Sequence, residues 1–166
     1  MLKSAQGKVD LFGDLDGDLK HIWGKIGENR VNNTIAYWTP SFSGFKVGGQ
    51  WVADESTDDA TQGFSVSAAY GDVKYKKMPY FVSLAYDSEV KSRDTFRITA
   101  GGKVAGFKLG AMYQASEASE GEKDKLDGYF VSVGYSINKQ WFVKGQVQGA
   151  ESVSYTHLTL PTTPYV

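Results

Sequence analysis

Residues 129–135, with the sequence YFVSVGY, carry the pattern that decides the fold. A tyrosine stands at each end, and Val131 and Val133 stand between them at alternate positions. Successive side chains of a β-strand point to opposite faces, so both rings and both valines share one face, while Ser132 and Gly134 lie on the other. The segment therefore predicts a strand with one apolar face and one polar or small face.

Four other segments repeat this order of an aromatic residue, two aliphatic or small residues and a second aromatic residue at alternate positions: 45–51, 64–70, 80–86 and 107–113. Six residues of strand separate the two rings by roughly 20 Å, which a tilt of about 40° reduces to about 15 Å along the barrel axis. Two aromatic levels around an aliphatic band are typical of a lipid-facing barrel wall. The predicted membrane aromatic girdle consists of Tyr37, Phe45, Trp51, Phe64, Tyr70, Tyr80, Tyr86, Phe107, Tyr113, Tyr129, Tyr135 and Trp141.

The same alternation runs from residue 29 to about residue 149 and predicts about eight strands. We expect these strands at 29–39, 44–53, 63–70, 79–87, 94–102, 106–115, 128–136 and 140–149. Long acidic links, such as 54–62 and 116–127, alternate with shorter or more basic ones, as in outer-membrane barrels. The fold class is therefore all-β, an antiparallel up-and-down transmembrane β-barrel. The link 71–78 is long for a short turn, so we expect the neighbouring strands to extend into it.

The composition excludes several classes of protein. The chain has 166 residues, a formal net charge of −1 and no cysteine. It therefore lacks the basic face of a nucleic-acid binder, and it has no thiolate nucleophile or Cys-ligated metal. It has no apolar run long enough for a transmembrane helix, and MLKSAQGKVD lacks the apolar core of a signal peptide. Its two histidines, His21 and His157, lie on none of the predicted strands, so we expect no enzyme, no metal site and no cofactor.

Both ends of the chain depart from the alternation. Residues 1–28 do not alternate, and the run Asp14, Asp16, Asp18 invites a calcium interpretation. An EF-hand loop starting at Asp14 would need Gly in place of Leu19 and Glu in place of Lys25, so a solvated acidic loop is the simpler interpretation. Residues 152–166, SVSYTHLTLPTTPYV, lose the alternation and resemble a translated sequencing-adapter tail. We expect this tail to be non-native, the alternative being a real β-rich terminus.

Several segments together resemble the Gram-negative trimeric general porins. The segment 28–37, ENRVNNTIAY, followed by PSFSGF at 40–45, is similar to the strand after the constriction loop and the short turn that follows it. The preceding GDLDGDLKHIWG resembles the end of the constriction loop itself. Later segments resemble successive wall strands: DTFRITAGG, FKLGAMYQ and DGYFVSVGYSINKQWFVKGQ. The resemblance covers roughly residues 10–150.

The resemblance implies an organisation into a constriction-loop-like segment at 1–28, wall strands and loops at 29–151, and the tail at 152–166. Family members have sixteen strands and a signal peptide, so the chain resembles an internal fragment whose signal peptide is missing by truncation. The implied location is the outer membrane, with lipid and lipopolysaccharide as partners and a homotrimeric parent protein. The implied function is passive diffusion of small hydrophilic solutes and ions through a water-filled pore.

The candidate pore residues come from two sources. By strand alternation, Lys46, Arg97, Lys108 and Lys144 point inward. The resemblance implies that Arg30 is the arginine following the constriction loop, and that the loop supplies acidic residues, for which we select Asp14, Asp16 and Asp18. Rings of fixed charge at a narrow point set the selectivity of such pores.

Two alternatives stay open at this point. A complete eight-stranded outer-membrane barrel, either structural or lipid-modifying, would fill its interior with side chains. A soluble lipocalin-like protein would bury the aromatic face around an apolar ligand.

Overall fold

A computed structural model describes residues 3–13, 31–53, 62–118, 125–151 and 153–159, with the backbone alone for 3–4 and 153–159. These residues form one short helix, α1 (Lys3–Val9), and nine strands. The strands are β1 (Thr34–Trp38), β2 (Phe45–Val52), β3 (Gly63–Gly71), β4 (Tyr80–Ser88), β5 (Arg93–Val104), β6 (Phe107–Ala118), β7 (Lys125–Ser136), β8 (Phe142–Ala150) and β9 (Val153–Thr159).

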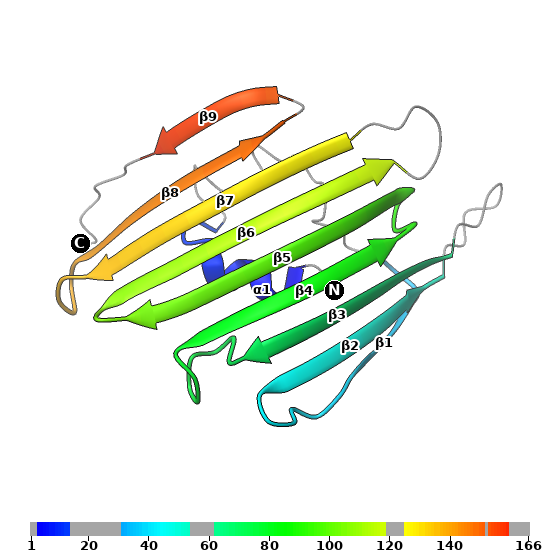
Figure 1. Cartoon of the computed structure of the whole chain (residues 1–166), viewed down its shortest axis with the longest axis horizontal. Helices are drawn as coiled ribbons and strands as arrows, with labels where there is room; N and C mark the ends of the chain where they lie inside the picture. Colours follow the sequence, from blue (N-terminus) through cyan, green and yellow to red (C-terminus); the bar gives the residue numbers. More distant parts are fainter. Residues whose placement is uncertain (1–2, 14–30, 54–61, 119–124, 152, 160–166) are drawn as a thin grey trace.

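The strands form a single antiparallel sheet in which each strand pairs with its neighbours in sequence, from β1 to β9 (Figure 1). The predicted all-β, up-and-down architecture is confirmed. The first strand begins at Thr34, later than the expected residue 29, while β5, β6 and β7 each reach 12 residues and run beyond their expected limits. Within the described residues, β1 and β9 do not pair with each other, so the sheet is an open segment of wall.

The two faces of the sheet differ sharply in exposure. Along β4, exposed and buried residues alternate from Tyr80 to Asp87, and the same alternation runs along most of β7. The exposed positions carry Val, Leu, Phe and Tyr, whereas most of the buried positions carry Ser, Thr, Gln, Gly or Arg. This inverts the arrangement of a water-soluble protein, in which apolar side chains are buried, and it is the arrangement that a lipid-facing wall requires.

The connections on one rim are short and well defined. Between β5 and β6, Ala105 and Gly106 both have positive φ, of 48° and 83°, as a two-residue hairpin turn of type I′ requires. Gly106 is suited to this position because it has no Cβ. The same rim carries the β1–β2 turn, the β3–β4 loop and the β7–β8 turn (Figure 1).

The expectation that strands extend into the link 71–78 is wrong. Strand β3 ends at Gly71 and β4 starts at Tyr80, and the residues between them form a loop. The physical reason is Asp72, whose Oδ1 accepts the backbone N–H of Lys74 at 2.8 Å and whose Oδ2 accepts those of Lys76 and Lys77, each at 2.7 Å. These bonds fold the chain back on itself in place of a ladder between strands.

The same bonds make the loop sensitive to pH. The backbone N–H of Lys77, followed by that of Lys74, holds the pKa of the Asp72 carboxyl below its ordinary value of 3.8. A carboxyl whose folded-state pKa is depressed stabilises the folded loop above its unfolded pKa. That contribution is lost as the pH falls through the folded-state pKa.

Asp72→Ala is expected to make trypsin cleave after Lys74, Lys76 and Lys77 several-fold faster at neutral pH, because the three backbone N–H groups lose their acceptor. Peptide mass mapping of timed digests measures this rate. Asp94→Ala is the matched control, since Asp94 accepts the backbone N–H of Glu89 in a different turn. Equal cleavage of the β3–β4 loop in both variants would contradict the assigned role of Asp72.

Candidate pore-lining site

The helix α1 lies against the inner face of the sheet, behind β5 and β6 in the view of Figure 1. Its residues Ala5 and Val9 are buried in an apolar cluster that includes Phe81, Met112 and Phe130 of the sheet. The last three side chains project from β4, β6 and β7 on the otherwise polar face. They supply the apolar surface on which a seven-residue helix, too short to be stable alone, is held.

The end of α1 is fixed to the wall by a hydrogen bond and a close approach. Ser132 Oγ donates to the backbone carbonyl of Val9 at 2.6 Å. Gly110, which pairs with Ser132 in the register of β6 and β7, faces the same point. A Cβ on Gly110 would lie 2.6 Å from Val9 Cβ and 2.9 Å from Val9 Cα, so only glycine leaves room for the segment here.

The residues after α1 continue along the inner face toward β8. Lys144 Nζ donates to the backbone carbonyl of Leu11 at 3.0 Å and lies 4.5 Å from the ring centre of Phe12. A Cβ on Gly134 would lie 3.1 Å from Leu11 Cδ1. Residues 5–12 are therefore seated across β5 to β8 by specific contacts.

Arg97 connects the wall to α1. The side chain is only 1% exposed, and its Nε donates to Gln114 Oε1 at 2.9 Å, while Nη2 donates to the same oxygen. Its Nη1 donates to Gln6 Oε1 at 2.5 Å, across 91 residues of sequence. The buried Asp87 carboxylate, which accepts a hydrogen bond from Ser65, lies within electrostatic reach of the guanidinium. A buried charge needs such partners, and the fork of Arg97 joins two elements at once.

The other inward lysines have different surroundings. Lys46 is exposed, and its Nζ lies 4.9 Å from the ring centre of Trp38, which covers Gly48 on the inner face. Lys108 is half-buried and lies close enough to Lys8 and Lys103 to interact with both electrostatically. A cleft with a volume of about 570 Å³, lined by Lys103 and Lys108 among others, opens beside it at the rim of the short turns.

The predicted pore residues thus divide into three groups. Arg97 and Lys144 contact the segment that contains α1, whereas Lys46 and Lys108 do not hydrogen-bond to it in the described part of the chain. Arg30, Asp14, Asp16 and Asp18 lie outside the described residues, and their assignment stays a prediction.

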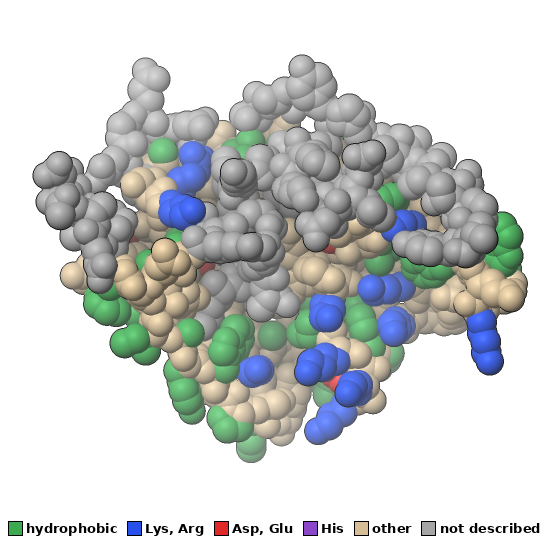
Figure 2. Space-filling model, turned by 180° about the vertical axis from the view of Figure 1, so that it is seen from behind, with side chains coloured by type: hydrophobic (Ala, Val, Ile, Leu, Met, Phe, Trp, Pro, Cys, Tyr) green, Lys and Arg blue, Asp and Glu red, His purple; other side chains and the backbone are tan. Residues whose placement is uncertain are grey.

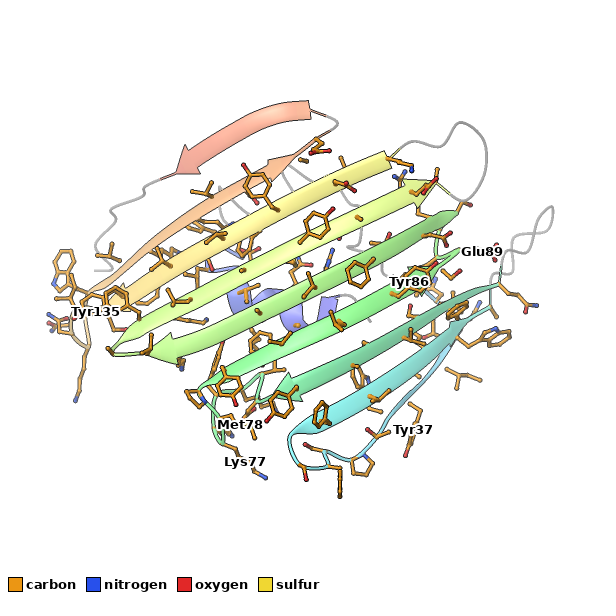
Figure 3. All side chains as sticks on the ribbon, in the orientation of Figure 1. Tyr37, Lys77, Met78, Tyr86, Glu89 and Tyr135 are labelled. Atoms are coloured by element: carbon orange, nitrogen blue, oxygen red, sulfur yellow. The ribbon has the colours of Figure 1, made fainter. Side chains whose placement is uncertain are left out.

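Ten of the aromatic residues predicted for the girdle lie on strands β2 to β7, on the opposite, outer face and in two levels. Tyr37 lies in β1 and Trp141 in the turn between β7 and β8, and the role of all twelve as a membrane girdle stays a prediction. At the rim of the short turns, the rings of Phe45 and Tyr70 are 4.6 Å apart, those of Tyr70 and Tyr80 are 6.3 Å apart, and those of Phe107 and Tyr135 are 4.5 Å apart. At the other level, three pairs of aromatic residues lie directly opposite each other on neighbouring strands: Trp51 and Phe64, Tyr86 and Phe96, and Tyr113 and Tyr129. Figure 3 shows Tyr86 and Tyr135 at opposite ends of the outer face, near these two levels.

Some contributors to the site were absent from the sequence-based selection. Phe96 is 41% exposed and lies opposite Tyr86 on the neighbouring strand. It therefore belongs to the same aromatic level of the outer face as Tyr86. Gln114 and Ser132 on the wall and Gln6 in α1 take part in the hydrogen bonds that hold the inner segment. Glutamine and serine are common on polar surfaces and give no distinguishing signal in the sequence. Alternation alone identified the face on which Gln114 and Ser132 lie.

An open antiparallel sheet with an apolar outer face, two aromatic levels and a polar inner face that holds an inward segment defines the wall of a membrane β-barrel. The family model for Gram-negative porins matches residues 8–159, and the chain belongs to this family. Such porins are outer-membrane β-barrels that pass small solutes and ions. A comparison with curated proteins gave no match.

Two further observations concern only the described part of the chain. None of its helices has the length and apolar character needed to cross a membrane. Nowhere in it do three His, Asp or Glu side chains gather as metal ligands would. The match to the porin family extends through β9 to residue 159, while the non-native origin of 152–166 stays a prediction.

Proposed function

We propose that the chain forms part of the wall of a larger outer-membrane porin, through which small hydrophilic solutes and ions diffuse passively, and that it acts as a channel and not as an enzyme. The observation that carries this proposal is the seating of residues 5–12 on the polar inner face, opposite the two aromatic levels. In this proposal residues 1–28 narrow the pore as an inward-folded segment. Arg30 and the inward lysines face the acidic residues Asp14, Asp16 and Asp18 across that narrow point.

The open sheet supports a larger barrel. An unpaired strand edge in lipid leaves backbone N–H and C=O groups without partners, at a cost of several kcal/mol for each group. In the described sheet β1 and β9 each pair on one side only, so further strands are needed to close the wall. We propose that these strands, and the signal peptide, belong to a longer parent chain that assembles as a homotrimer contacting lipid and lipopolysaccharide.

The first experiment determines the source DNA sequence beyond both ends of this reading frame. We expect an upstream signal peptide and alternating strands, and downstream strands ending in an aromatic residue in place of residues 152–166. The intact porin is then reconstituted in a planar lipid bilayer, where open channels should give stepwise ion currents. A genuine start at Met1 and a stop after Val166 would refute the larger barrel, and a folded intact barrel without current would refute the channel.

The inward lysines make a prediction for ion selectivity. Lys108→Glu in the intact porin is expected to lower the anion-to-cation permeability ratio by about threefold, because two unit charges a few ångströms apart in water interact by about 1 kcal/mol before salt screening. The reversal potential across a salt gradient measures this ratio. Lys139→Glu, in the exposed turn between β7 and β8, makes the same charge change away from the inner face and is the matched control.

A shift of equal size in the Lys139 variant would mean that the total charge of the rim, and not the position of Lys108, sets the ratio. An unchanged ratio in the Lys108 variant would remove this lysine from the ion path.

Neither alternative fold receives support from the structure. A lipocalin-like binder needs the aromatic face inside, whereas the exposed rings lie on the face away from α1 (Figure 3). A closed eight-stranded barrel needs its first and last strands paired, and no such pairing is present in the described sheet.

A further inference from the structure

A second lysine-lined cleft lies at the rim of the short turns, away from the inner segment. It has a volume of about 560 Å³ and is formed by the β1–β2 turn and the β3–β4 loop. Its polar lining comes from Ser41, Ser43, Asp72, Lys74, Lys76 and Lys77. The two serines and the three lysines are exposed, so the cleft combines three ammonium groups with two hydroxyl groups that are open to solvent or to a membrane surface.

The positive charge of this cleft is left largely uncompensated. Among the lining residues that the structure describes, Asp72 is the only carboxylate, and both of its oxygens already accept backbone N–H groups of the loop. In the described part of the chain no ion pair is formed by Lys74, Lys76 or Lys77. The cleft therefore carries a net charge of about +2 and offers its ammonium groups to an anion from outside the protein.

The cleft adjoins the aromatic level of the outer face. A Cβ on Gly44, which lines the cleft, would lie 2.9 Å from Met78 Cε and 3.2 Å from Tyr70 Cε2. Tyr70 belongs to the run of rings from Phe45 to Tyr80 described above. Figure 3 shows Met78 and Lys77 together at the same end of the outer face, and Figure 2 shows Lys and Arg side chains gathered along this rim.

This position matches one ligand chemistry. Tyrosine and tryptophan rings mark the headgroup level of a membrane, and lysines immediately beyond that level meet the phosphates of lipid headgroups. We propose that the cleft formed by Ser41, Ser43, Lys74, Lys76 and Lys77 binds the phosphate of an anionic phospholipid whose acyl chains lie along the outer face beside Tyr70. The proposal rests on the proposed function only in requiring that this face meets lipid.

Lipid retention by the intact porin tests the proposal. The protein is transferred from mixed micelles of phosphatidylglycerol and phosphatidylcholine, and the lipids that stay bound are counted by native mass spectrometry. The wild-type protein should retain phosphatidylglycerol preferentially. Replacement of Lys74, Lys76 and Lys77 by glutamine should lower that preference by about tenfold or more, since each lysine near an anionic lipid surface strengthens binding by roughly fivefold.

Two further variants separate the site from its charge alone. K91Q/K125Q/K139Q removes the same number of charges outside the cleft and should keep the preference for phosphatidylglycerol, as should K74R/K76R/K77R, which keeps the charge of the cleft. All substituted positions are exposed, so the variants are expected to fold. Comparing the gel migration of heated and unheated samples checks that each variant forms the folded barrel.

An unchanged preference in K74Q/K76Q/K77Q, or an equal loss in both glutamine variants, would overturn the proposal. It would also be overturned if lipid retention stayed constant while the reversal potential of the channel shifted, because the lysines would then act on permeating anions. Channel activity is measured separately, so a barrel without current that still retains the lipid would contradict the proposed function and leave the lipid site supported.

Discussion

Replacing Arg97 with alanine is expected to lower the free energy of unfolding of the intact porin by about 3 kcal/mol. The guanidinium is almost fully buried and donates to both Gln114 and Gln6, so its removal leaves two buried amide oxygens and the nearby Asp87 carboxylate without their cation. Hydrogen bonds to charged groups each contribute about 1.5 to 3 kcal/mol, and an uncompensated buried carboxylate adds to the loss. Urea unfolding of the detergent-folded barrel, followed by tryptophan fluorescence, measures the change.

The same variant should alter the channel. Without the bond to Gln6, α1 loses its polar connection to β5, and single-channel currents should become noisier as the inner segment moves. Arg97→Lys keeps the charge but cannot supply the planar fork, so it should fall between the wild type and alanine. A stability of Arg97→Lys as low as that of Arg97→Ala, with quiet currents in both, would show that Arg97 stabilises the strands alone and does not position α1.

The outer face was predictable from the sequence because a single physical rule determines it. Lipid requires apolar side chains at every second position and aromatic rings at both interfaces, and the exposed residues of β4, β6 and β7 follow that rule. Register follows as well, since a slip by one residue would place the polar face in lipid. The observed pairing of Tyr113 with Tyr129 and of Phe107 with Tyr135 aligns the two levels.

The inner face was predictable only in part, because it obeys a weaker constraint. Phe81 and Phe130 occupy inward positions where alternation predicts polar or small residues. These large apolar side chains are buried there because they pack in one cluster with Ala5 and Val9 of α1, which is far away in the sequence. No local feature of the sequence KSAQGKV predicts a helix of seven residues. The helix forms because it packs against an apolar part of the inner face. The bond from Arg97 to Gln6 spans most of the chain, and alternation shows only that Arg97 points inward.

The fit of α1 against the wall makes a second strong prediction. Gly110→Val is expected to lower the free energy of unfolding of the intact porin by about 2 kcal/mol, within the range for overfilled packing. Even a Cβ at this position would approach Val9 Cα to 2.9 Å and Ser132 Oγ to 2.6 Å. The backbone of α1 must then move toward the pore axis, breaking the bond between Ser132 and the Val9 carbonyl, and the single-channel conductance should fall.

Gly49→Val is the matched control for this prediction. Gly49 lies in β2 on the outer face, and a Cβ there would meet nothing within 4 Å. Valine is favoured over glycine in strands, so this variant should be neutral or slightly more stable, with unchanged conductance. If Gly110→Val behaved in the same way, the inner segment would not rest on β6 in the assembled pore. A loss of stability confined to Gly110→Val, together with a reduced conductance, would show that the missing side chain at Gly110 is what allows residues 5–12 to pack against the inner face.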